Sequence, residues 1–244
     1  MQNRHTIVVA IIVALGIALA GWFIGRGFIK ARFSGRYVTV RGIAERDVKA
    51  DLALWPIRLV ASGNDLRATQ DNLGANISKV REFLAKHGME SGSADLQKLD
   101  VIDAFANPYQ DSRVVRNRYV VRQTLMVRSD RPDTVLKASR NVGELVSAGI
   151  VLSAENEYTA SGPTFLFTKL NDLKPEMISE AITNGRKGAA RFAEASGSEL
   201  GGIRQANQGL FEILPRDNAP GITEGSQIHK KIRVVSTIDY FLSN

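Results

Sequence analysis

The chain has 244 residues and a formal net charge of +7, which leaves room for one substantial domain or two small ones behind an N-terminal segment. Four of its cations lie in residues 1–32, which hold no acid, so the remainder carries only +3. That modest excess argues against nucleic acid as the main partner. The absence of cysteine excludes disulfides, thiolate metal sites and cysteine nucleophiles.

An uncharged, predominantly apolar stretch runs from Thr6 to Gly25 and ends at Arg26. At about 1.5 Å per helical residue, it spans roughly the hydrocarbon core of a bilayer. Apolar side chains surround such a helix, so no polar face remains for packing on a soluble core. We therefore predict a single-pass membrane anchor with the apolar residues Ile7, Val9, Ile12, Leu15, Leu19, Trp22 and Phe23.

Two interpretations of this stretch remain open. It is an uncleaved signal anchor, or a cleaved signal peptide with Ala18–Ala20 as the small-x-small cleavage site. The anchor is favoured because the apolar run continues past that site and Trp22 suits a membrane interface. Gly21 and Gly25 form a G-x-x-x-G pair of the kind that lets helices associate closely in lipid.

The charges that flank the anchor give a conflicting orientation. Arg4 precedes it, whereas Arg26, Lys30, Arg32 and Arg36 follow. Taken literally, the positive-inside rule would place the C-terminal body in the cytoplasm.

The remaining chain is predicted to follow the order ββ-α-ββ-α-β-α-ββ. The expected strands cover 36–42, 50–61, 96–106, 116–127, 203–214 and 228–242, with irregular strand structure over 151–166. Helices are expected from Asn64 or Asp65 to about His87, from Pro132 to about Gly149, and over 172–196. Pro56 inside the second strand implies an edge position or a bulge.

Two of these elements carry patterns that specify their faces. The strand over 116–127 alternates polar and apolar residues with one slip at Gln123–Thr124. The helix over 172–196 is expected to bury a stripe of small and apolar residues that suits tight packing on a sheet: Ile178, Ala181, Ile182, Gly185, Ala189, Phe192 and Ala193. The fold class is therefore α+β, with antiparallel sheets and packed helices. Residues 1–34 form the anchor and a basic stalk, and 35–244 form one folded body or two α+β subdomains.

The sequence offers no catalytic signature. It contains no P-loop, no G-x-S-x-G motif, and no histidine pair at ligand spacing. Asp100 and Asp103 should point to opposite faces of a strand, so they and Asp95 are interpreted as surface acids. Glu155 and Glu157 share a face but lack an accompanying base or nucleophile. We expect no enzyme activity, no cofactor and no metal.

A basic hairpin is the most distinctive charged feature of the body. It carries Arg113, Arg116, Arg118, Arg122 and Arg128. An anionic partner such as a lipid headgroup or a nucleic acid is one interpretation. An edge strand protected by charge, or a contact between subunits, is the favoured one.

Several stretches, taken together, resemble the SIMPL-domain family, long known as a domain of unknown function. The segment VTVRGIAERDVKADLA resembles the family's opening strand–turn–strand, with Asp51 at its acidic position before the second strand. Later stretches resemble family motifs in the same order, at Gly88–Met89, Asp95–Gln97 and Leu200–Gly201. The final strand KKIRVVSTIDYFL is also similar. The resemblance covers about residues 37–242, although Gly185 and Gly188 interrupt the usual alanine run of the third helix.

The resemblance implies an exported protein of the Gram-negative envelope, periplasmic or tethered to the inner membrane. Some family members form large ring- or channel-like homo-oligomers, and others are linked to oxidative-stress tolerance. The family offers no established catalytic residues. Since large domains translocate despite unfavourable flanking charge, we expect a cytoplasmic N-terminus and a periplasmic body.

Two main hypotheses follow. The first is a non-catalytic, membrane-anchored envelope protein that self-assembles into a large ring- or channel-like homo-oligomer and is linked to envelope or oxidative stress. The second is a monomeric or dimeric adaptor that binds another envelope protein or an anionic ligand through the Arg113–Arg128 hairpin. An enzyme that uses aspartate or glutamate is the least favoured alternative.

Overall fold

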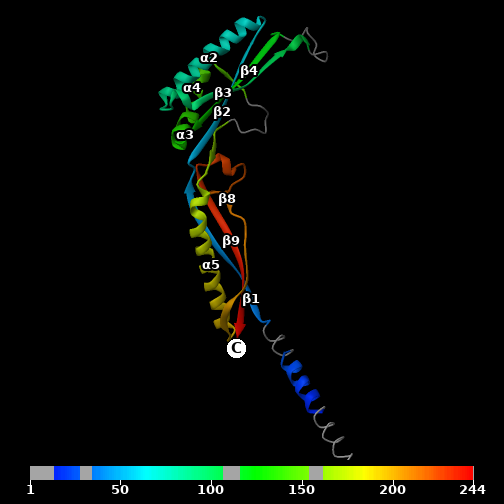
Figure 1. Cartoon of the computed structure of the whole chain (residues 1–244). Coiled ribbons are helices and arrows are strands. Elements are labelled where there is room, and N and C mark those ends of the chain that lie inside the picture. The colour runs from blue at the N-terminus through cyan, green and yellow to red at the C-terminus, as the bar shows by residue number, and fades with distance from the viewer. Residues whose placement is uncertain (1–13, 28–34, 107–115, 154–161, 244) are drawn as a thin grey trace, which may run out of the picture. The chain divides into compact units, whose positions relative to one another are not determined.

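A computed structural model of the chain describes residues 14–27, 35–106, 116–153 and 162–243 (Figure 1). The protein is α+β with antiparallel sheets, as predicted. After a helix over residues 14–27, the elements are β1 (Tyr37–Lys49), β2 (Leu52–Gly63), α2 (Leu66–Lys86), η1 (Ser91–Ser93), β3 (Ala94–Asp103), η2 (Ala104–Ala106), β4 (Tyr119–Ser129), α3 (Pro132–Arg140), α4 (Gly143–Ser147), β5 (Val151–Leu152), β6 (Thr164–Leu166), α5 (Leu170–Ala195), β7 (Glu199–Gln208), β8 (Glu212–Pro215), η3 (Glu224–Ser226) and β9 (His229–Ser243).

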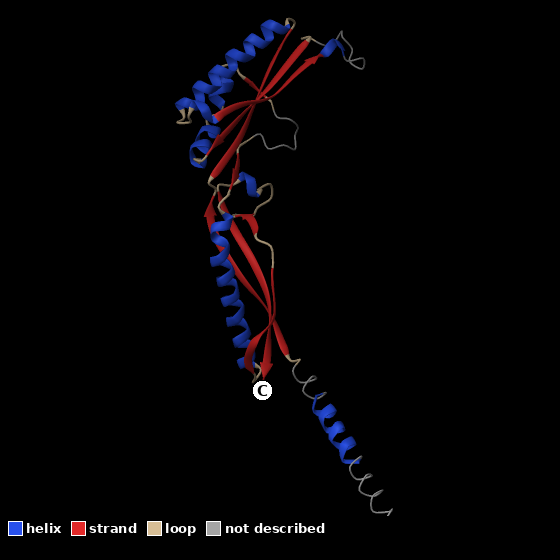
Figure 2. Cartoon of the chain, in the orientation of Figure 1, coloured by secondary structure: helices blue, strands red, loops and turns tan. Residues whose placement is uncertain are grey.

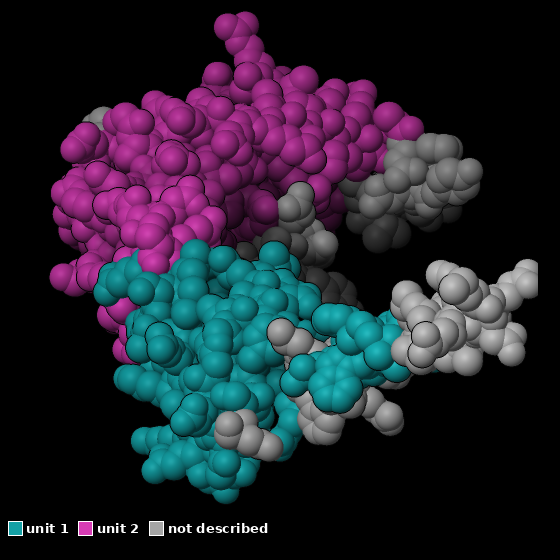
Figure 3. Space-filling view, turned by 60° about the horizontal axis from the view of Figure 1, so that its bottom comes forward, with its two compact units in different colours: residues 1–44, 176–211, 234–244 teal, residues 45–175, 212–233 magenta. Residues whose placement is uncertain are grey.

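The chain divides into two compact units, coloured separately in Figure 3. The first unit comprises residues 1–44, 176–211 and 234–244, and the second comprises 45–175 and 212–233. Each unit is therefore assembled from segments that are distant in the sequence.

The second unit contains a sheet with the order β3-β4-β2-β5, and β6 also pairs with β2. Helices α2, α3 and α4 gather on one side of this sheet (Figure 1). Strict alternation along β2 and β4 turns every second side chain toward the helices. These side chains form one core with the helices, which includes Trp55, Ile57, Leu59, Val80, Leu84, Val121, Leu125, Val127, Val135, Ala138 and Leu145.

Pro56 occupies a local edge within a central strand. Pro56 pairs with Met126 of β4 on one side. On the other side, β6 covers residues 52–54 and β5 covers 59–60, so neither strand reaches Pro56. The missing N–H of proline is tolerated where a strand has no neighbour. The expected edge position is thus local to Pro56, while β2 as a whole lies inside the sheet.

The slip predicted in β4 is wrong, because the irregularity lies in β3. The register between these strands shifts between Leu96 and Leu99, which indicates a bulge in β3. Gln123 keeps the alternation of β4 and is buried. Its amide nitrogen donates to the carbonyl oxygen of Gln97 at 2.5 Å. The buried Gln123 amide therefore supplies a hydrogen bond to a backbone carbonyl at the bulge, where the regular pairing of the strands is interrupted.

Helix ends follow the predicted capping residues. The Asp65 carboxylate caps α2 by accepting from the backbone N–H of Ala68 at 2.8 Å. Gly88, Gly149 and Gly197 follow helices and adopt positive φ, the conformation in which glycine ends a helix most easily. The helix expected from Pro132 to Gly149 is divided into α3 and α4.

The first unit is organised around the close approach of α5 to β1. Its sheet has the order β1-β9-β7, and α5 lies along it (Figure 2). A methyl group added at Gly42 would lie 1.8 Å from the carbonyl oxygen of Ala181. One added at Gly185 would lie 3.3 Å from the backbone nitrogen of Gly42. The strand and helix therefore touch through their backbones, and the Asn184 amide donates to the carbonyl oxygen of Ile43 at 3.0 Å.

The buried stripe of α5 is narrower than predicted. Met177, Ala181, Gly185, Ala189 and Ala193 are buried, at regular intervals of four residues. Contrary to expectation, Ile182 and Phe192 are exposed. From Ala181 to Ala193 this row contains only alanine and glycine, because the helix lies close to the strand there, and the bulkier Ile182 and Phe192 on either side of the row stay outside.

The strand expected over 203–214 is interrupted and becomes β7 and β8. Both pair with β9, and Gly209 between them donates its N–H to the carbonyl oxygen of Val235 at 2.8 Å. In the second unit, the fully buried Lys230 of β9 forms an ion pair with Glu224 and donates to its carbonyl oxygen at 2.6 Å. This pairing holds the Pro/Gly-rich segment before β9 in place.

In the described part of the chain, no helix is long and apolar enough to cross a membrane. The predicted anchor begins in residues 1–13, so Ile7, Val9 and Ile12 lie outside the described residues. The helix over 14–27 exposes Leu15, Leu19, Trp22 and Phe23.

Asp51, the residue at the acidic position noted above, ties the start of β2 to the segment before α5. Its carboxylate accepts the backbone N–H of Thr168 at 2.7 Å and the Thr168 hydroxyl at 2.8 Å. Desolvation by partial burial raises the pKa of Asp51. The hydrogen bonds from Thr168 and the nearby Lys169 outweigh that effect, so the pKa lies below its ordinary value.

We predict that Gly42→Ala destabilises the protein by about 1–3 kcal/mol, because the new methyl group forces α5 away from β1. Gly188→Ala in the same helix is the matched control, since nothing lies within 4 Å of its added methyl group. That control should stabilise the protein by up to about 1 kcal/mol. Chemical denaturation measures both. Equal effects of the two substitutions would contradict the close approach.

A second prediction concerns pH. Asp51→Asn should lower the free energy of unfolding by about 1 kcal/mol at neutral pH, because the charged acceptor of Thr168 is lost at a partly exposed site. A lowered pKa stabilises the fold above the ordinary value of 3.8 and loses that effect as pH falls through the folded-state pKa. The difference between wild type and variant should therefore disappear in acid. A difference that stays constant with pH would exclude this account.

Candidate functional site

A polar concave surface of the second unit lies on the face of its sheet opposite the helices. The alternation that buries Leu59 and Gln123 turns Arg58, Arg122 and Thr124 toward this open face. The antiparallel register sets Arg58 opposite Thr124. It sets Arg122 between Asp100 of β3 and Val60 of β2.

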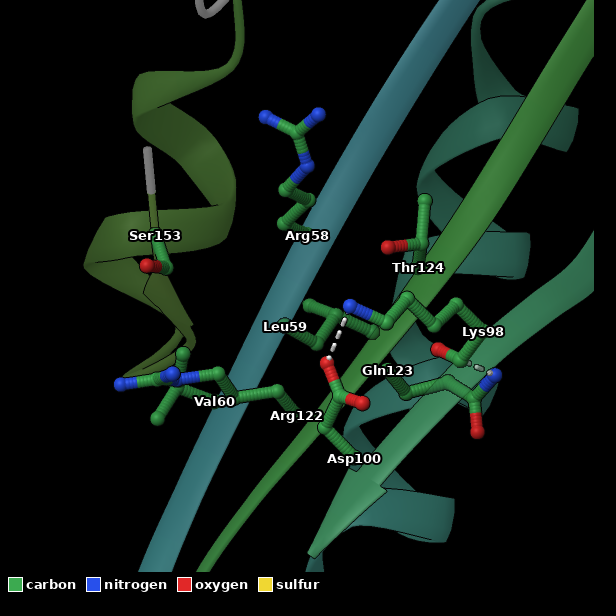
Figure 4. A pocket seen from close by; sticks show the side chains of 9 residues that line it. All are labelled: Arg58, Leu59, Val60, Lys98, Asp100, Arg122, Gln123, Thr124 and Ser153. Atoms are coloured by element: carbon green, nitrogen blue, oxygen red, sulfur yellow. Dashed lines mark hydrogen bonds and ion pairs between the residues drawn. The ribbon is translucent and has the colours of Figure 1, made fainter. Parts of the chain in front are cut away.

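These residues line a cavity of about 180 Å³ (Figure 4). Lys98 and Asp100 contribute from β3, and Ser153 contributes from the end of β5. The backbone N–H of Ser153 donates to the carbonyl oxygen of Arg58 at 3.0 Å, which places its hydroxyl beside β2. Figure 4 shows the Arg122 side chain extending past Val60 and the Arg58 side chain leaving the sheet in a different direction.

The acid in this cavity already has a cationic partner. The ammonium group of Lys98 lies 3.0 Å from the Asp100 carboxylate. Arg122 is exposed, although its strand position is directly opposite Asp100. Positive charge therefore exceeds negative charge among the described lining residues.

A separate cluster of side chains contacts Arg118, which lies just before the start of β4. Its Nε lies 3.2 Å from both carboxylate oxygens of Asp103, and a terminal nitrogen lies 2.9 Å from one of them. The guanidinium group also lies 5.7 Å from the ring centre of Phe105 and 4.9 Å from that of Tyr119. Hydrogen bonding from Arg118 holds the pKa of Asp103 below its ordinary value.

The predicted basic patch is therefore divided rather than continuous. Arg113 lies outside the described residues, and Arg116 is exposed. Arg118 is bound by Asp103 and holds the hairpin ends together. Among the described arginines of this patch, Arg122 lines the cavity, together with Arg58 and Lys98, which the sequence pattern did not indicate, whereas Arg128 lines a different cavity. The missing information was strand pairing, because only the register brings β2 and β3 to either side of Arg122.

The candidate carboxylates do not form one group. Asp100 pairs with Lys98, and Asp103 pairs with Arg118. Glu155 and Glu157 lie outside the described residues. Over the described ranges, no three side chains of histidine, aspartate or glutamate gather in a way that would hold a metal ion.

Strand β3 forms an edge of the sheet and exposes apolar side chains. It has β4 on one side and, within the described strands, no neighbour on the other. Leu96, Leu99 and Val101 are each about half exposed, as is Phe105 just beyond the strand, and Ile102 is 40% exposed. An edge with this composition is a surface on which another chain can pair.

Comparison with known proteins gives one match. Residues 38–228 match the sequence model of the SIMPL family, described as a protein of unknown function (DUF541). The match covers nearly all of the second unit and residues 38–44 and 176–211 of the first, and it ends before β9. It confirms the family resemblance found in the sequence. None of the curated proteins matches the chain significantly.

We predict that Arg118→Gln raises the pKa of Asp103 toward its ordinary value of 3.8, because the hydrogen bonds that stabilise its charged form are lost. A carboxyl-detected NMR titration measures this directly. Arg116→Gln removes the same charge two residues away and should leave Asp103 unchanged. If the pKa of Asp103 rises equally in both variants, the loss of one positive charge nearby explains the change, and the hydrogen bonds from Arg118 do not.

Proposed function

The chain belongs to the SIMPL family, and we propose that this member is a non-catalytic, membrane-anchored envelope protein that self-assembles into a large homo-oligomer of ring- or channel-like form. Its N-terminus lies in the cytoplasm, its anchor crosses the inner membrane of a Gram-negative cell, and its body lies in the periplasm. A link to envelope or oxidative stress is part of this proposal.

The anchor is supported by the apolar stretch from Thr6 to Gly25. Where that stretch is described, its helix leaves Leu15, Trp22 and Phe23 more than half exposed. Exposed apolar groups all round a helix are stable when lipid or another helix covers them. Gly21 and Gly25 have open space around their Cα atoms, so a neighbouring helix can approach closely there.

The observation that carries self-assembly is the apolar edge of β3, which no strand of the described residues covers. The strand has features that ordinarily prevent an edge from pairing with another chain. These are the bulge and the charged residues Asp95, Lys98 and Asp100. Even so, four apolar side chains of the strand remain exposed. A second copy of the chain would pair with its backbone and cover these side chains.

A closed ring requires two complementary surfaces on each chain. Strand β7 supplies a second edge, since it ends the order β1-β9-β7. Ile203 on this strand is about half exposed, and Leu210 just beyond it is almost fully exposed. Both units therefore carry a strand edge with exposed apolar groups, which supports repeated association better than a single dimer contact.

We predict that the full-length protein in mild detergent is one large, uniform species by light scattering. Leu99→Lys should reduce its mass, because a charge on the β3 edge opposes pairing and burial. Val146→Lys is the matched control: Val146 is 59% exposed but lies on α4 rather than on an edge strand. This control should leave the mass unchanged, and circular dichroism should show that both variants are folded.

Comparison with a chain that begins at Ser34 separates the body from the anchor. A large species in both chains assigns assembly to the body. A large species only in the full-length chain assigns it to the helix with Gly21 and Gly25, and contradicts the role of β3. A monodisperse monomer at micromolar concentration would overturn self-assembly and favour the alternative, a tethered adaptor.

A further inference from the structure

We propose that Asn184 is a site of spontaneous deamidation, and that the contact of α5 with β1 controls this modification. Asn184 is converted into aspartate or isoaspartate when α5 separates from β1. The reacting groups belong to one chain, so the reaction is expected of a monomer and of an oligomer alike. It therefore goes beyond self-assembly and does not depend on it.

The chemistry follows from the residue after Asn184. Residues 184 and 185 are the one Asn-Gly pair of the sequence, and glycine has no side chain to hinder attack by its backbone nitrogen. That nitrogen bonds to the side-chain carbonyl carbon of Asn184. The C–N bond of the side-chain amide breaks, and the proton of the Gly185 N–H leaves with the amide nitrogen as ammonia. Water then opens the five-membered imide at either carbonyl, which gives aspartate or isoaspartate without any oxidant or reductant.

The attacking nitrogen is covered by β1 in the folded protein. Gly185 belongs to the buried row of α5. A methyl group added at Gly42 would lie 2.7 Å from the Gly185 nitrogen and 1.8 Å from the carbonyl oxygen of Ala181. These two groups are four residues apart, the spacing of the hydrogen bond in an α-helix, so Gly42 packs directly over that bond. The nitrogen is therefore engaged as a donor and shielded from water.

The attacked side chain is restrained by the next residue of the same strand. Asn184 is exposed, yet its amide donates to the carbonyl oxygen of Ile43 at 3.0 Å. Its helical backbone has ψ near about −42°, whereas ring closure requires the Gly185 nitrogen to rotate toward the side chain. Since Gly42 restrains one reacting group and Ile43 the other, separation of α5 from β1 frees both at once.

The product would prevent α5 from packing on β1 as before. An aspartate at position 184 has no N–H to donate, and its carboxylate would face the carbonyl oxygen of Ile43, which is also an acceptor. Isoaspartate in addition lengthens the backbone by one carbon atom, which shifts Gly185 away from Gly42. Deamidation therefore leaves a permanent covalent mark on each copy whose first unit has opened.

Peptide mapping by mass spectrometry tests this proposal on the full chain in mild detergent at slightly alkaline pH. It separates asparagine, aspartate and isoaspartate at position 184 during the incubation. A synthetic peptide of residues 180–189 gives the rate without protection. We expect the folded protein to react at least about tenfold more slowly than the peptide, because the reaction requires a sparsely populated local opening.

Two alanine variants separate the contact with β1 from the protection that any helix provides. Gly42→Ala should raise the rate at Asn184 by at least about fivefold, which is the smallest destabilisation predicted above, about 1 kcal/mol, converted at about 1.36 kcal/mol per factor of ten. Gly188→Ala leaves the contact intact, since nothing lies within 4 Å of its added methyl group, and should not raise the rate. Circular dichroism shows whether each variant is folded.

A third comparison tests the consequence of the product. Asn184→Asp should accelerate hydrogen exchange of the amides of α5, because the donor to Ile43 is replaced by an acceptor. Thr183→Asp is the matched control: it adds the same charge one residue earlier, where the exposed hydroxyl donates to Ser179 of its own helix. This control should change the exchange less.

The proposal is overturned if Asn184 reacts in the folded wild type as fast as in the peptide, or if Gly42→Ala and Gly188→Ala react at the same rate. Should Gly42→Ala fail to fold, wild type in urea below its unfolding transition provides the test. The rate at Asn184 should then rise together with hydrogen exchange of the Gly185 amide, and a rate that stays constant would also overturn the proposal.

Discussion

The long antiparallel pairing of β2 with β4 is the constraint on which the second unit depends. It runs without interruption from Ala53 opposite Ser129 to Gly63 opposite Tyr119. Since side chains alternate along both strands, one register determines two surfaces at once. One carries Leu59 and Leu125 into the core. The other brings Arg58, Thr124 and Arg122 together on the open face.

The bulge in β3 and the proline in β2 leave the register between β2 and β4 unchanged. The bulge in β3 is compensated by the buried amide of Gln123, which accounts for a polar residue at a core position of β4. Pro56 is accommodated because β5 and β6 leave a gap beside it. Both residues look like interruptions of a strand pattern in the sequence, yet each matches a local feature of the sheet around it.

The first unit depends on a different constraint, the backbone contact between Gly42 and α5. A helix this close to a strand tolerates only small residues where the two elements touch, which explains Ala181, Gly185, Ala189 and Ala193 in the buried row of α5. Ile182 and Phe192 remain outside as a consequence. Ile182 and Phe192 are exposed apolar residues, as are several on β3 and β7. Self-assembly, as proposed above, would bury such residues.

The sequence by itself determined the fold class, the order of most elements, the helix caps at Asp65 and Gly88, and the family. These features depend on local periodicity, on glycine and proline chemistry, and on residues close together along the chain. It also indicated Arg122 as one residue of a charged surface. Only the tertiary structure decided that Arg118 is bound to Asp103 while Arg122 joins Arg58 and Lys98 at a cavity. Pairing across strands relates residues from distant segments, and neither hydrophobic period nor local propensity specifies which strands become neighbours.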